Sequence, residues 1–228
     1  MLGGFRFGIT GREEPLDLSG GSQRLLAFLA LRECPVPRTA AAATLWPDAS
    51  EEHAAASLRS AINRLGQIAH QAISASHHSL CLAGDVAVDI RASRALAHRL
   101  LDPGAPRDEA DLNEVAINAL SADLLPDWYD EWAVQEAEDW RQLRLRALDT
   151  LCLELTSRGR YGDAISAALA AVNAEPLRED SHANLIRVHL AEGNRSEARR
   201  AFERYRTLLR LELEVEPSPR LRALLQGC

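Results

Sequence analysis

The stretch "SLRSAINRLGQIAH" (residues 57–70) is where the fold of the N-terminal half can first be worked out. Wound as an α-helix together with the residues just before it, the stretch gathers apolar side chains on one face and polar ones on the opposite face. The apolar face holds Ala54, Leu58, Ala61, Ile62, Leu65 and Ala69. The polar face holds Ser60, Asn63 and Gln67, flanked by Arg59 and Arg64. The pattern predicts an amphipathic helix whose polar face is either a solvated surface or a surface that reads bases in the major groove.

Two shorter helices are predicted before this one. Residues 22–31 ("SQRLLAFLAL") are dense in leucine and alanine, and a proline-marked break then leads to a short helix that ends at Trp46. The third helix begins at "WPDASEEH", where Asp48 and Glu51 stand three residues apart, as in a capping box. Its apolar face is expected to pack on the first two helices.

Short β-like runs flank these helices on both sides. Residues 5–9 and 15–18 alternate as a small hairpin would, around a turn at Gly11. After the helices, "AISAS", a tip at His77–His78, "SLCLAG" and "VAVDI" alternate as a second hairpin. Hairpin, three helices, hairpin is the order of a winged helix-turn-helix, so residues 1–92 are predicted to form an α+β DNA-binding domain.

Residues 93–228 are predicted to be helical throughout and to contain a repeat. Gly159 and Gly193 are 34 residues apart, as are Ala164 and Ala198, and this is the tetratricopeptide period. The predicted fold class is therefore mainly α, a winged helix followed by an all-α tetratricopeptide-like domain. Such repeats usually bind proteins.

Composition excludes several functional classes. The chain is ordinary in apolar and charged content, and no apolar run is long enough to cross a bilayer. The start has no basic region followed by an apolar one, so no secretory signal is expected, and the predicted location is cytoplasmic. The four cysteines are scattered, as in reduced cytosolic proteins. No P-loop, dinucleotide fingerprint, nucleophile elbow or metal-ligand set occurs, so we expect no enzyme, no cofactor and no metal.

The charge distribution argues against strong DNA binding. All 26 basic residues are arginine, and the net charge is −7. Residues 1–92 contain eight arginines against nine acidic residues, so the predicted DNA-binding domain is close to neutral. Because phosphate neutralisation supplies most non-specific affinity for DNA, such a domain should bind weakly by itself. We therefore expect two copies of the protein on adjacent sites.

Several motifs resemble a known family of regulators. "ELEVEPSPRLRALL" (212–225), "LLPDWYDEW" (124–132) and "EPLREDSHANLIRVHLAEGNRSEARRAFERYRTLL" (175–209) resemble the bacterial transcriptional activator domain. In the Streptomyces antibiotic regulatory protein family this domain follows a winged helix, and "TLWPDASEEHAAASLRSAINRL" (44–65) is similar to that DNA-binding half. The resemblance implies an activator that binds double-stranded DNA at repeat sites near promoters and recruits RNA polymerase. A homodimer on DNA is the expected assembly.

The residues expected to contact DNA fall into two groups. Asparagine and glutamine can pair with adenine and arginine with guanine, so base contacts are assigned to Arg59, Ser60, Asn63, Arg64 and Gln67. Phosphate contacts are assigned to residues near helix starts and at the wing tip, namely Ser22, Arg38, Thr39, His77 and His78. Two positions depart from the family pattern. Gly66 stands where a basic residue is expected, and the wing tip carries histidines in place of a permanent cation.

Two further interpretations stay open. Trp128, Tyr129, Trp132 and Trp140 form the aromatic concentration of the sequence, which is expected to pack the long helix against its neighbours, with a ligand cage or a partner-facing tryptophan as the alternative. The alternative for the whole chain is an interaction module whose winged helix no longer binds DNA. Low basic charge and Gly66 favour that alternative, whereas the intact polar face of residues 57–70 favours DNA binding.

Overall fold

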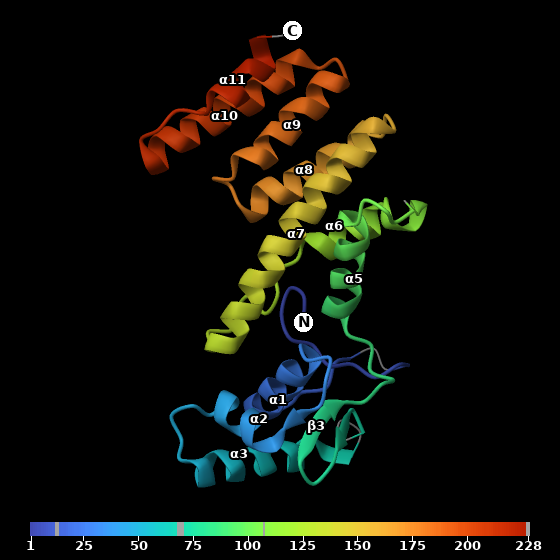
Figure 1. Ribbon diagram of the computed structural model, residues 1–228, viewed down its shortest axis with the longest axis vertical. Coiled ribbons are helices and arrows are strands. Elements are labelled where there is room, and N and C mark those ends of the chain that lie inside the picture. Colours follow the sequence, from blue (N-terminus) through green and yellow to red (C-terminus); the bar gives the residue numbers. More distant parts are fainter. Residues whose placement is uncertain (12–13, 68–70, 107, 227–228) are drawn as a thin grey trace. The chain divides into compact units, whose positions relative to one another are not determined.

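The computed structural model describes residues 1–11, 14–67, 71–106 and 108–226 (Figure 1). The chain divides into two compact units. Unit 1 comprises Met1–Ala92 and Asp123–Glu138, and unit 2 comprises Ser93–Ala122 and Asp139–Cys228. The segment 123–138, which the sequence placed in the C-terminal domain, thus packs with the N-terminal unit.

Unit 1 is built on short helices and a small antiparallel sheet. The helices are α1 (Gly20–Ala30), α2 (Arg38–Leu45) and α3 (Glu51–Asn63). The strands are β1 (Val36–Pro37), β2 (Ile73–Ala75) and β3 (Ser79–Leu82). They form one three-stranded sheet in the order β1-β3-β2, with Val36 opposite Leu80 and Ser74 opposite Cys81. This arrangement confirms the predicted winged-helix class.

The β-hairpins were predicted with mixed success. β2 and β3 form the expected hairpin with His77 and His78 at its tip. Residues 86–90, in contrast, form no strand, because α5 (Asp89–Leu101) already begins there. The described part of residues 5–18 contains no strand either, and Leu16 N–H donates to the Phe7 carbonyl at 2.8 Å. Residues 2 and 3 pair with the segment 123–124. Leu2 forms a β-bridge with Leu124, and Gly3 N–H donates to the Asp123 carbonyl.

Helix α3 is shorter than the sequence indicated. Its N-cap is Ser50, not Asp48, and the Ser50 hydroxyl accepts from the His53 N–H. The helix ends at Asn63, and Gly66 has a φ of +68°, a left-handed conformation that favours glycine. Gly66 therefore follows the helix and does not interrupt it. The expected continuous helix to residue 70 is wrong at residues 64–65, which form a turn; residues 66–67 are helical again, and residues 68–70 lie outside the described part of the chain.

The core of unit 1 lies beneath α1. Leu25 is fully buried, and the Phe28 ring packs edge-on against Trp132 at 5.5 Å between centroids. The apolar face of α3 closes this core, as predicted. Its described members Ala54, Leu58, Ala61, Ile62 and Leu65 are all buried, while Ala69 lies outside the described residues.

Unit 2 is helical, as expected. After the later part of α5 it contains a short 3-10 helix, η1 (Glu109–Asp111), and a series of α-helices. These are α6 (Glu114–Ser121), α7 (Glu131–Ser157), α8 (Tyr161–Ala174), α9 (Glu179–Ala191), α10 (Arg195–Leu213) and α11 (Pro219–Gln226). Helix α7 contributes its residues up to Glu138 to unit 1. Helix α9 packs against α8 on one side and α10 on the other.

The 34-residue repeat has a direct structural counterpart. Gly159 (φ +72°) and Gly193 (φ +86°) end α7 and α9 in the same left-handed conformation. In both turns the next residue donates its N–H to a carbonyl five positions back, Arg160 to Leu155 and Asn194 to His189. The paired alanines, Ala164 and Ala198, are completely buried. They let successive helices approach closely, which explains why the period is visible in the sequence.

Buried polar contacts fix the start of the helical array. The Trp140 indole N–H donates to the Ala122 carbonyl at 3.0 Å. The Arg144 guanidinium, 1% exposed, donates to the Ser121 carbonyl at 2.7 Å. Both contacts satisfy carbonyls at the C-terminal end of α6, which have no partner within that helix. None of the described helices is both long enough and apolar enough to cross a membrane.

Candidate nucleic-acid interface

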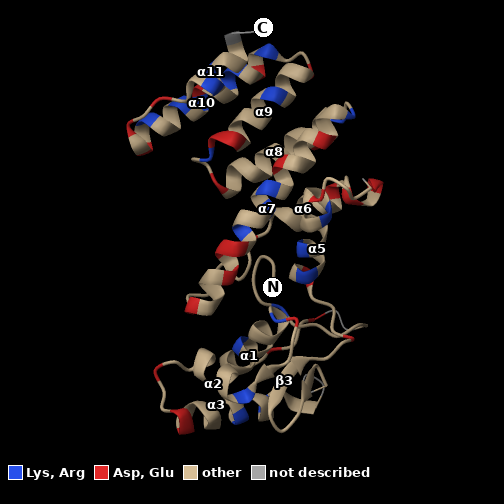
Figure 2. Cartoon of the chain, in the orientation of Figure 1, with Lys and Arg blue, Asp and Glu red and all other residues tan. Residues whose placement is uncertain are grey.

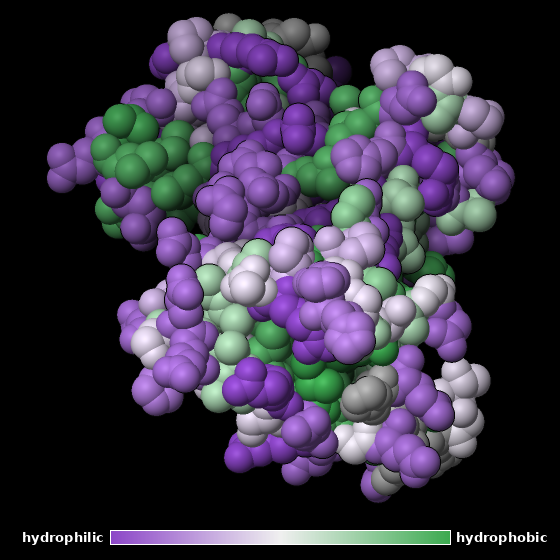
Figure 3. Space-filling view, turned by 60° about the horizontal axis from the view of Figure 1, so that its bottom comes forward, coloured by the Kyte–Doolittle hydropathy of each residue, from purple (hydrophilic) through white to green (hydrophobic). Residues whose placement is uncertain are grey.

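A groove of about 500 Å³ runs between α3, the start of α2 and the tip of the wing. Its walls bring together four residues that the sequence assigned to DNA contact. These are Arg38, Thr39, Arg59 and His77. The floor is apolar, formed by Ala55, Leu58 and Ala75. Three segments far apart in sequence thus place their polar side chains around one shallow concavity. In Figure 3, unit 1 presents a mainly hydrophilic face with a small hydrophobic area between the polar residues.

The outer side of α3 is accessible along its C-terminal half. Arg59, Asn63 and Arg64 are exposed, and Ser60 is half-buried. Within the described part of the chain, the side chains of the two arginines and of Asn63 make no hydrogen bond or ion pair. Such side chains keep all their donors for an external acceptor. Figure 2 shows acidic residues at the N-terminal end of α3 and basic residues further along it.

The wing is tied to the start of α2 by Arg38. Its backbone N–H donates to the His78 carbonyl at 2.9 Å, and its Nε donates to the Ser76 carbonyl at 2.9 Å. Ser76 in turn accepts from the N–H groups of His78 and Ser79, which closes the tip of the hairpin. Arg38 therefore positions the wing as well as facing the groove. Thr39 is exposed in the first turn of α2, where helix N–H groups attract anions.

Two of the assigned residues need correction. Ser22 is completely buried, and its hydroxyl donates to the Ala61 carbonyl at 2.9 Å, so it joins α1 to α3 and cannot reach a phosphate. Gln67 is exposed but follows the left-handed Gly66. Because α3 ends at Asn63, the helical wheel that placed Gln67 beside Asn63 does not extend that far.

Sequence reasoning missed Ser76 and strand β1. Ser76 lines the groove and makes the hydrogen bonds that shape the wing tip. Its signal was available, because a serine in a turn commonly accepts hydrogen bonds from backbone N–H groups a few residues further along the chain. Strand β1 comprises only Val36 and Pro37, too short to show an alternating pattern.

The charge of unit 1 differs from the charge of residues 1–92. The segment 123–138 adds six acidic residues and no arginine, so unit 1 carries eight arginines against fifteen acidic residues. Unit 2 carries eighteen of each. The whole net charge of −7 thus belongs to the unit that contains the candidate interface. Long-range electrostatic attraction to DNA is therefore unfavourable for this unit.

The aromatic residues do not form a single cluster. Trp128 and Trp132 pack edge-on at 5.9 Å between centroids, and Phe5 lies 5.9 Å from Trp128. Trp140 is buried in unit 2, and Tyr129 is 87% exposed. Three of the four aromatic residues therefore pack in the fold, as expected.

The described thiols are dispersed, and one of them is deeply buried. Burial raises the pKa of the Cys152 thiol to about 12, which leaves it protonated and unreactive at neutral pH. Cys34 is exposed and Cys81 half-buried. No group of three or more histidine, cysteine or acidic side chains is arranged to hold a metal ion in the part of the chain that the structure describes.

Comparison with known proteins places this architecture in context. The family described as "Bacterial transcriptional activator domain" matches residues 85–227, more than half of the chain. The regulatory protein AfsR of Streptomyces coelicolor is 30% identical over 251 residues, which cover 98% of this chain and 24% of AfsR. The chain thus spans about a quarter of that relative's length.

A solved structure of similar fold covers almost the whole chain. It is that of Mycobacterium tuberculosis EmbR in complex with a low affinity phosphopeptide, with a TM-score of 0.62 and 23% identity. The match covers 99% of this chain and 62% of the EmbR chain. At this identity the likeness shows the fold alone.

Proposed function

The chain belongs to the bacterial transcriptional activator domain family, and from that premise we propose that it is a DNA-binding transcriptional activator. The resemblance to the Streptomyces antibiotic regulatory proteins is confirmed by the same matches. The observation that carries the proposal is the groove in which Arg38, Thr39, Arg59 and His77 converge. In a winged helix the third helix enters the major groove and the wing lies on the adjacent backbone, and residues of both α3 and the wing line this groove, which supports the proposal.

The contacts divide into base reading and phosphate binding. Arg59 and Asn63 of α3 and the C-cap residue Arg64 are exposed, Ser60 beside them is half-buried, and together they provide the donors and acceptors that base edges require. Thr39, His77, His78 and the free N–H groups of Arg38 bind phosphates on either side. Gln67 is left out of the base-reading set for the reason given above.

Affinity requires more than one copy of the protein. Unit 1 is net negative, so a single winged helix neutralises few phosphates and binds weakly. Two protomers on adjacent repeat sites gain affinity through their mutual contact. The helical array of unit 2 supplies that contact or a contact to RNA polymerase, since stacked helix pairs typically bind proteins.

The experiment is selection of bound sequences from a random duplex pool with the full chain at low salt, followed by binding isotherms on the selected site. We expect a recovered repeat motif. Replacing Arg59 or Asn63 with alanine should weaken binding by about 1–3 kcal/mol, which is roughly five- to 150-fold. Arg6→Ala is the matched control, because Arg6 is an exposed arginine of unit 1 outside the groove and should leave the dissociation constant unchanged.

One observation favours a second function. The acidic charge of unit 1 suits an interaction module whose winged helix no longer binds DNA. No enriched sequence at low salt would reject DNA binding and support this alternative. A motif recovered with wild-type protein but bound equally well by the Arg59 and Asn63 variants would reject α3 as the reading helix.

A further inference from the structure

A groove of unit 2 lies among the last helices of the array. It has a volume of about 500 Å³ and is lined by side chains of α9, α10 and α11, all of them in unit 2. On α10 the lining residues Arg195, Arg199, Phe202 and Arg206 recur at intervals of three or four, so they form one stripe along that helix. At a rise of 1.5 Å per residue the stripe is about 16 Å long. The groove therefore follows α10 for about three turns.

The charged groups of this groove leave an excess of positive charge. Glu203 pairs with Arg206 at 2.6 Å and Glu216 with Arg210 at 2.5 Å, so both acidic residues of the lining are compensated. Three further lining arginines are exposed, and their side chains make no hydrogen bond or ion pair with the described part of the chain. These three are Arg195, Arg199 and Arg222. In Figure 2, basic residues lie on both α10 and α11. The groove thus gathers three uncompensated cations in a unit whose formal charge is zero.

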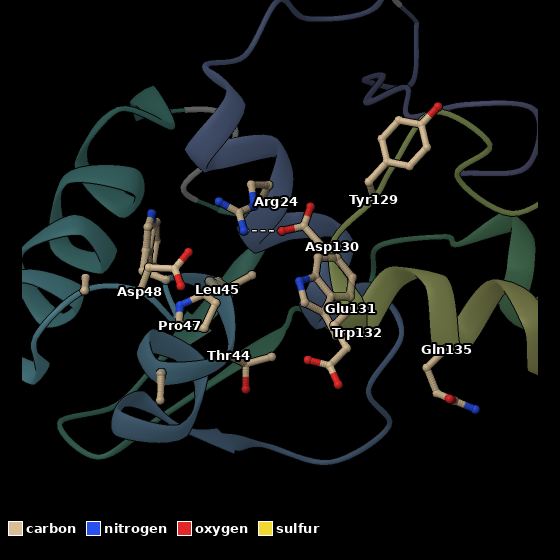
Figure 4. A pocket seen from close by; sticks show the side chains of 13 residues that line it. Arg24, Thr44, Leu45, Pro47, Asp48, Tyr129, Asp130, Glu131, Trp132 and Gln135 are labelled. Atoms are coloured by element: carbon tan, nitrogen blue, oxygen red, sulfur yellow. Dashed lines mark hydrogen bonds and ion pairs between the residues drawn. The ribbon is translucent and has the colours of Figure 1, made fainter.

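The concavity of unit 1 drawn in Figure 4 differs in this respect. Its volume is about 990 Å³, and Arg24 is the cation among the described residues that line it. Figure 4 shows Arg24 joined to Asp130 by an ion pair, so this cation is already compensated within the chain. In the groove of unit 2 the three arginines keep their donors for carboxylates from outside the chain, with which a guanidinium forms paired hydrogen bonds.

Apolar side chains lie in the same groove as these cations. Phe202 is 7% exposed, and Leu190 and Leu225 are half-buried. The half-buried leucines leave apolar surface in contact with water, and covering that surface with an apolar side chain is favourable. An occupant that carries carboxylates and apolar side chains together matches both features of the groove.

These features favour a protein segment over a nucleic acid. Duplex DNA presents a negative charge about every 1.7 Å of its axis, so its backbone would also approach the carboxylates of Glu203 and Glu216. A protein segment can place its carboxylates opposite Arg195 and Arg199, one helical turn apart, and its apolar side chains opposite the leucines. Stacked helix pairs of this kind typically bind proteins.

We propose that this groove binds an acidic amphipathic helix of a partner protein. A helix of about eleven residues has the length of the stripe on α10. Its apolar side chains pack on the leucines of the groove, and carboxylates beside them pair with the three unpartnered arginines, as in other helix-in-groove complexes. The proposal makes no use of DNA binding and so goes beyond the proposed activator function.

The test uses three fluorescein-labelled helical peptides. The first carries leucines on one face and glutamates beside them, the second has glutamine in place of each glutamate, and the third has serine in place of each leucine. Fluorescence anisotropy with the full chain, without DNA and at low salt, should show that the first peptide binds at least about tenfold more tightly than either of the others. No binding of the first peptide at millimolar concentration, or equal binding of the first peptide and either analogue, would overturn the proposal.

Paired arginine variants locate the binding. Arg199→Gln with Arg222→Gln removes one unpartnered arginine from α10 and one from α11, and should weaken binding of the first peptide at least about tenfold. The matched control is Arg204→Gln with Arg220→Gln, which removes the same charge from the same two helices at exposed positions outside the groove. It should change the affinity less than about twofold. Circular dichroism checks that both proteins are folded. Equal loss in the two paired variants, or unchanged affinity in the first, would contradict the site.

Other occupants of the groove are outcomes of the same experiments. Sedimentation velocity that shows a dimer lost in the first paired variant, while the peptide does not bind, would assign the groove to a second copy of this chain and overturn the proposal. Random duplex DNA bound through the same arginines, again without peptide binding, would assign it to nucleic acid with the same consequence. Because peptide binding is measured without DNA, its failure leaves the selection experiment on the activator function unaffected.

Discussion

The arginines of α3 and the arginines between the repeat helices differ in what they contact. Arg59 and Arg64 are exposed and have no partner among the residues that the structure describes. Arg178, at the start of α9, pairs with Asp149 of α7 and donates to the Ser181 hydroxyl at 3.0 Å. Arg160, at the start of α8, pairs with Glu109 of η1 at 3.1 Å. The same residue type thus joins helices in unit 2 and stays available in α3.

This difference offers a way to separate binding residues from structural ones in a chain whose basic residues are all arginine. A partnered arginine lowers the energy of the folded chain, and its removal leaves a carboxylate without its counter-charge. An exposed arginine without a partner contributes little to folding, so its removal should appear only when a ligand is present. Composition alone cannot make this distinction.

The largest expected effect is the difference in the free energy of unfolding between Arg178→Ala and Arg59→Ala. In the first variant Asp149, whose side chain is 14% exposed, keeps only its hydrogen bond from Asn184. We expect the free energy of unfolding to fall by about 2 kcal/mol, less than for a fully buried pair because Arg178 is 26% exposed. Arg59→Ala should change it by less than about 0.5 kcal/mol.

Urea unfolding followed by circular dichroism measures both variants. DNA binding completes the comparison, because Arg59→Ala should lose affinity for the selected site while remaining as stable as wild type. If both variants lost the same stability, the distinction between partnered and free arginines would fail.

The repeats could be predicted from the sequence because their signal is redundant. The turn glycines and the buried alanines recur at the same spacing, and each pair supports the other. The unit boundary shows the limit of such patterns. Residues 123–138 read as part of the helical domain, yet they pack on α1 through Trp132 and on the N-terminal strand through Leu124. Contacts between residues about a hundred positions apart produce no periodic pattern in the sequence, so they could not be predicted from it.

The candidate site could be predicted in part because α3 has a regular amphipathic pattern. Helix amphipathicity identified Arg59 and Asn63, because burial of one face of α3 fixes which face is outward. Proximity to a helix start did not identify Ser22 correctly, since the side of α1 that carries it faces Ala61. The end of α3 was missed because a glycine inside a helix and a glycine in the left-handed region look alike in sequence.

A smaller difference in the free energy of unfolding is expected between Gly→Ala substitutions at two glycines. Gly66→Ala should lower the free energy of unfolding by about 1–2 kcal/mol, because its φ of +68° strains any L-residue, although a Cβ there would meet no atom of the described residues within 4 Å. Gly162 lies in the first turn of α8 with equally open surroundings. There the same substitution should raise stability by up to about 1 kcal/mol.

The two glycine variants differ only in the backbone conformation that receives the methyl group. Thermal and urea unfolding of both variants give the sign of each change. A stabilised Gly66→Ala protein would mean that α3 continues through this position, and that Gln67 returns to the reading face.

The smallest effect concerns the pH dependence of stability and rests on a buried histidine of the repeat core. His182 is buried in α9, stacks on Tyr205 at 4.1 Å between centroids, and its Nε2 lies 2.9 Å from the Pro176 carbonyl. Burial, reinforced by the nearby Arg204, lowers the pKa of His182 below its ordinary value of 6.5, against opposing effects of the Pro176 carbonyl and Glu179. His182 is therefore protonated near pH 6.5 in the unfolded chain but requires a lower pH to be protonated in the folded chain.

Because the unfolded state binds more protons below that pH, the stability contributed by neutral His182 is complete above about pH 7.5 and declines as the pH falls through 6.5. The decline is limited to about 1.4 kcal/mol per pH unit for one group. Urea unfolding at pH 7.5, 6.5 and 5.5 should show this slope in wild type and a shallower one in His182→Gln, whose amide can still donate to the Pro176 carbonyl. Identical slopes would assign the pH dependence to other groups and leave His182 a packing residue only.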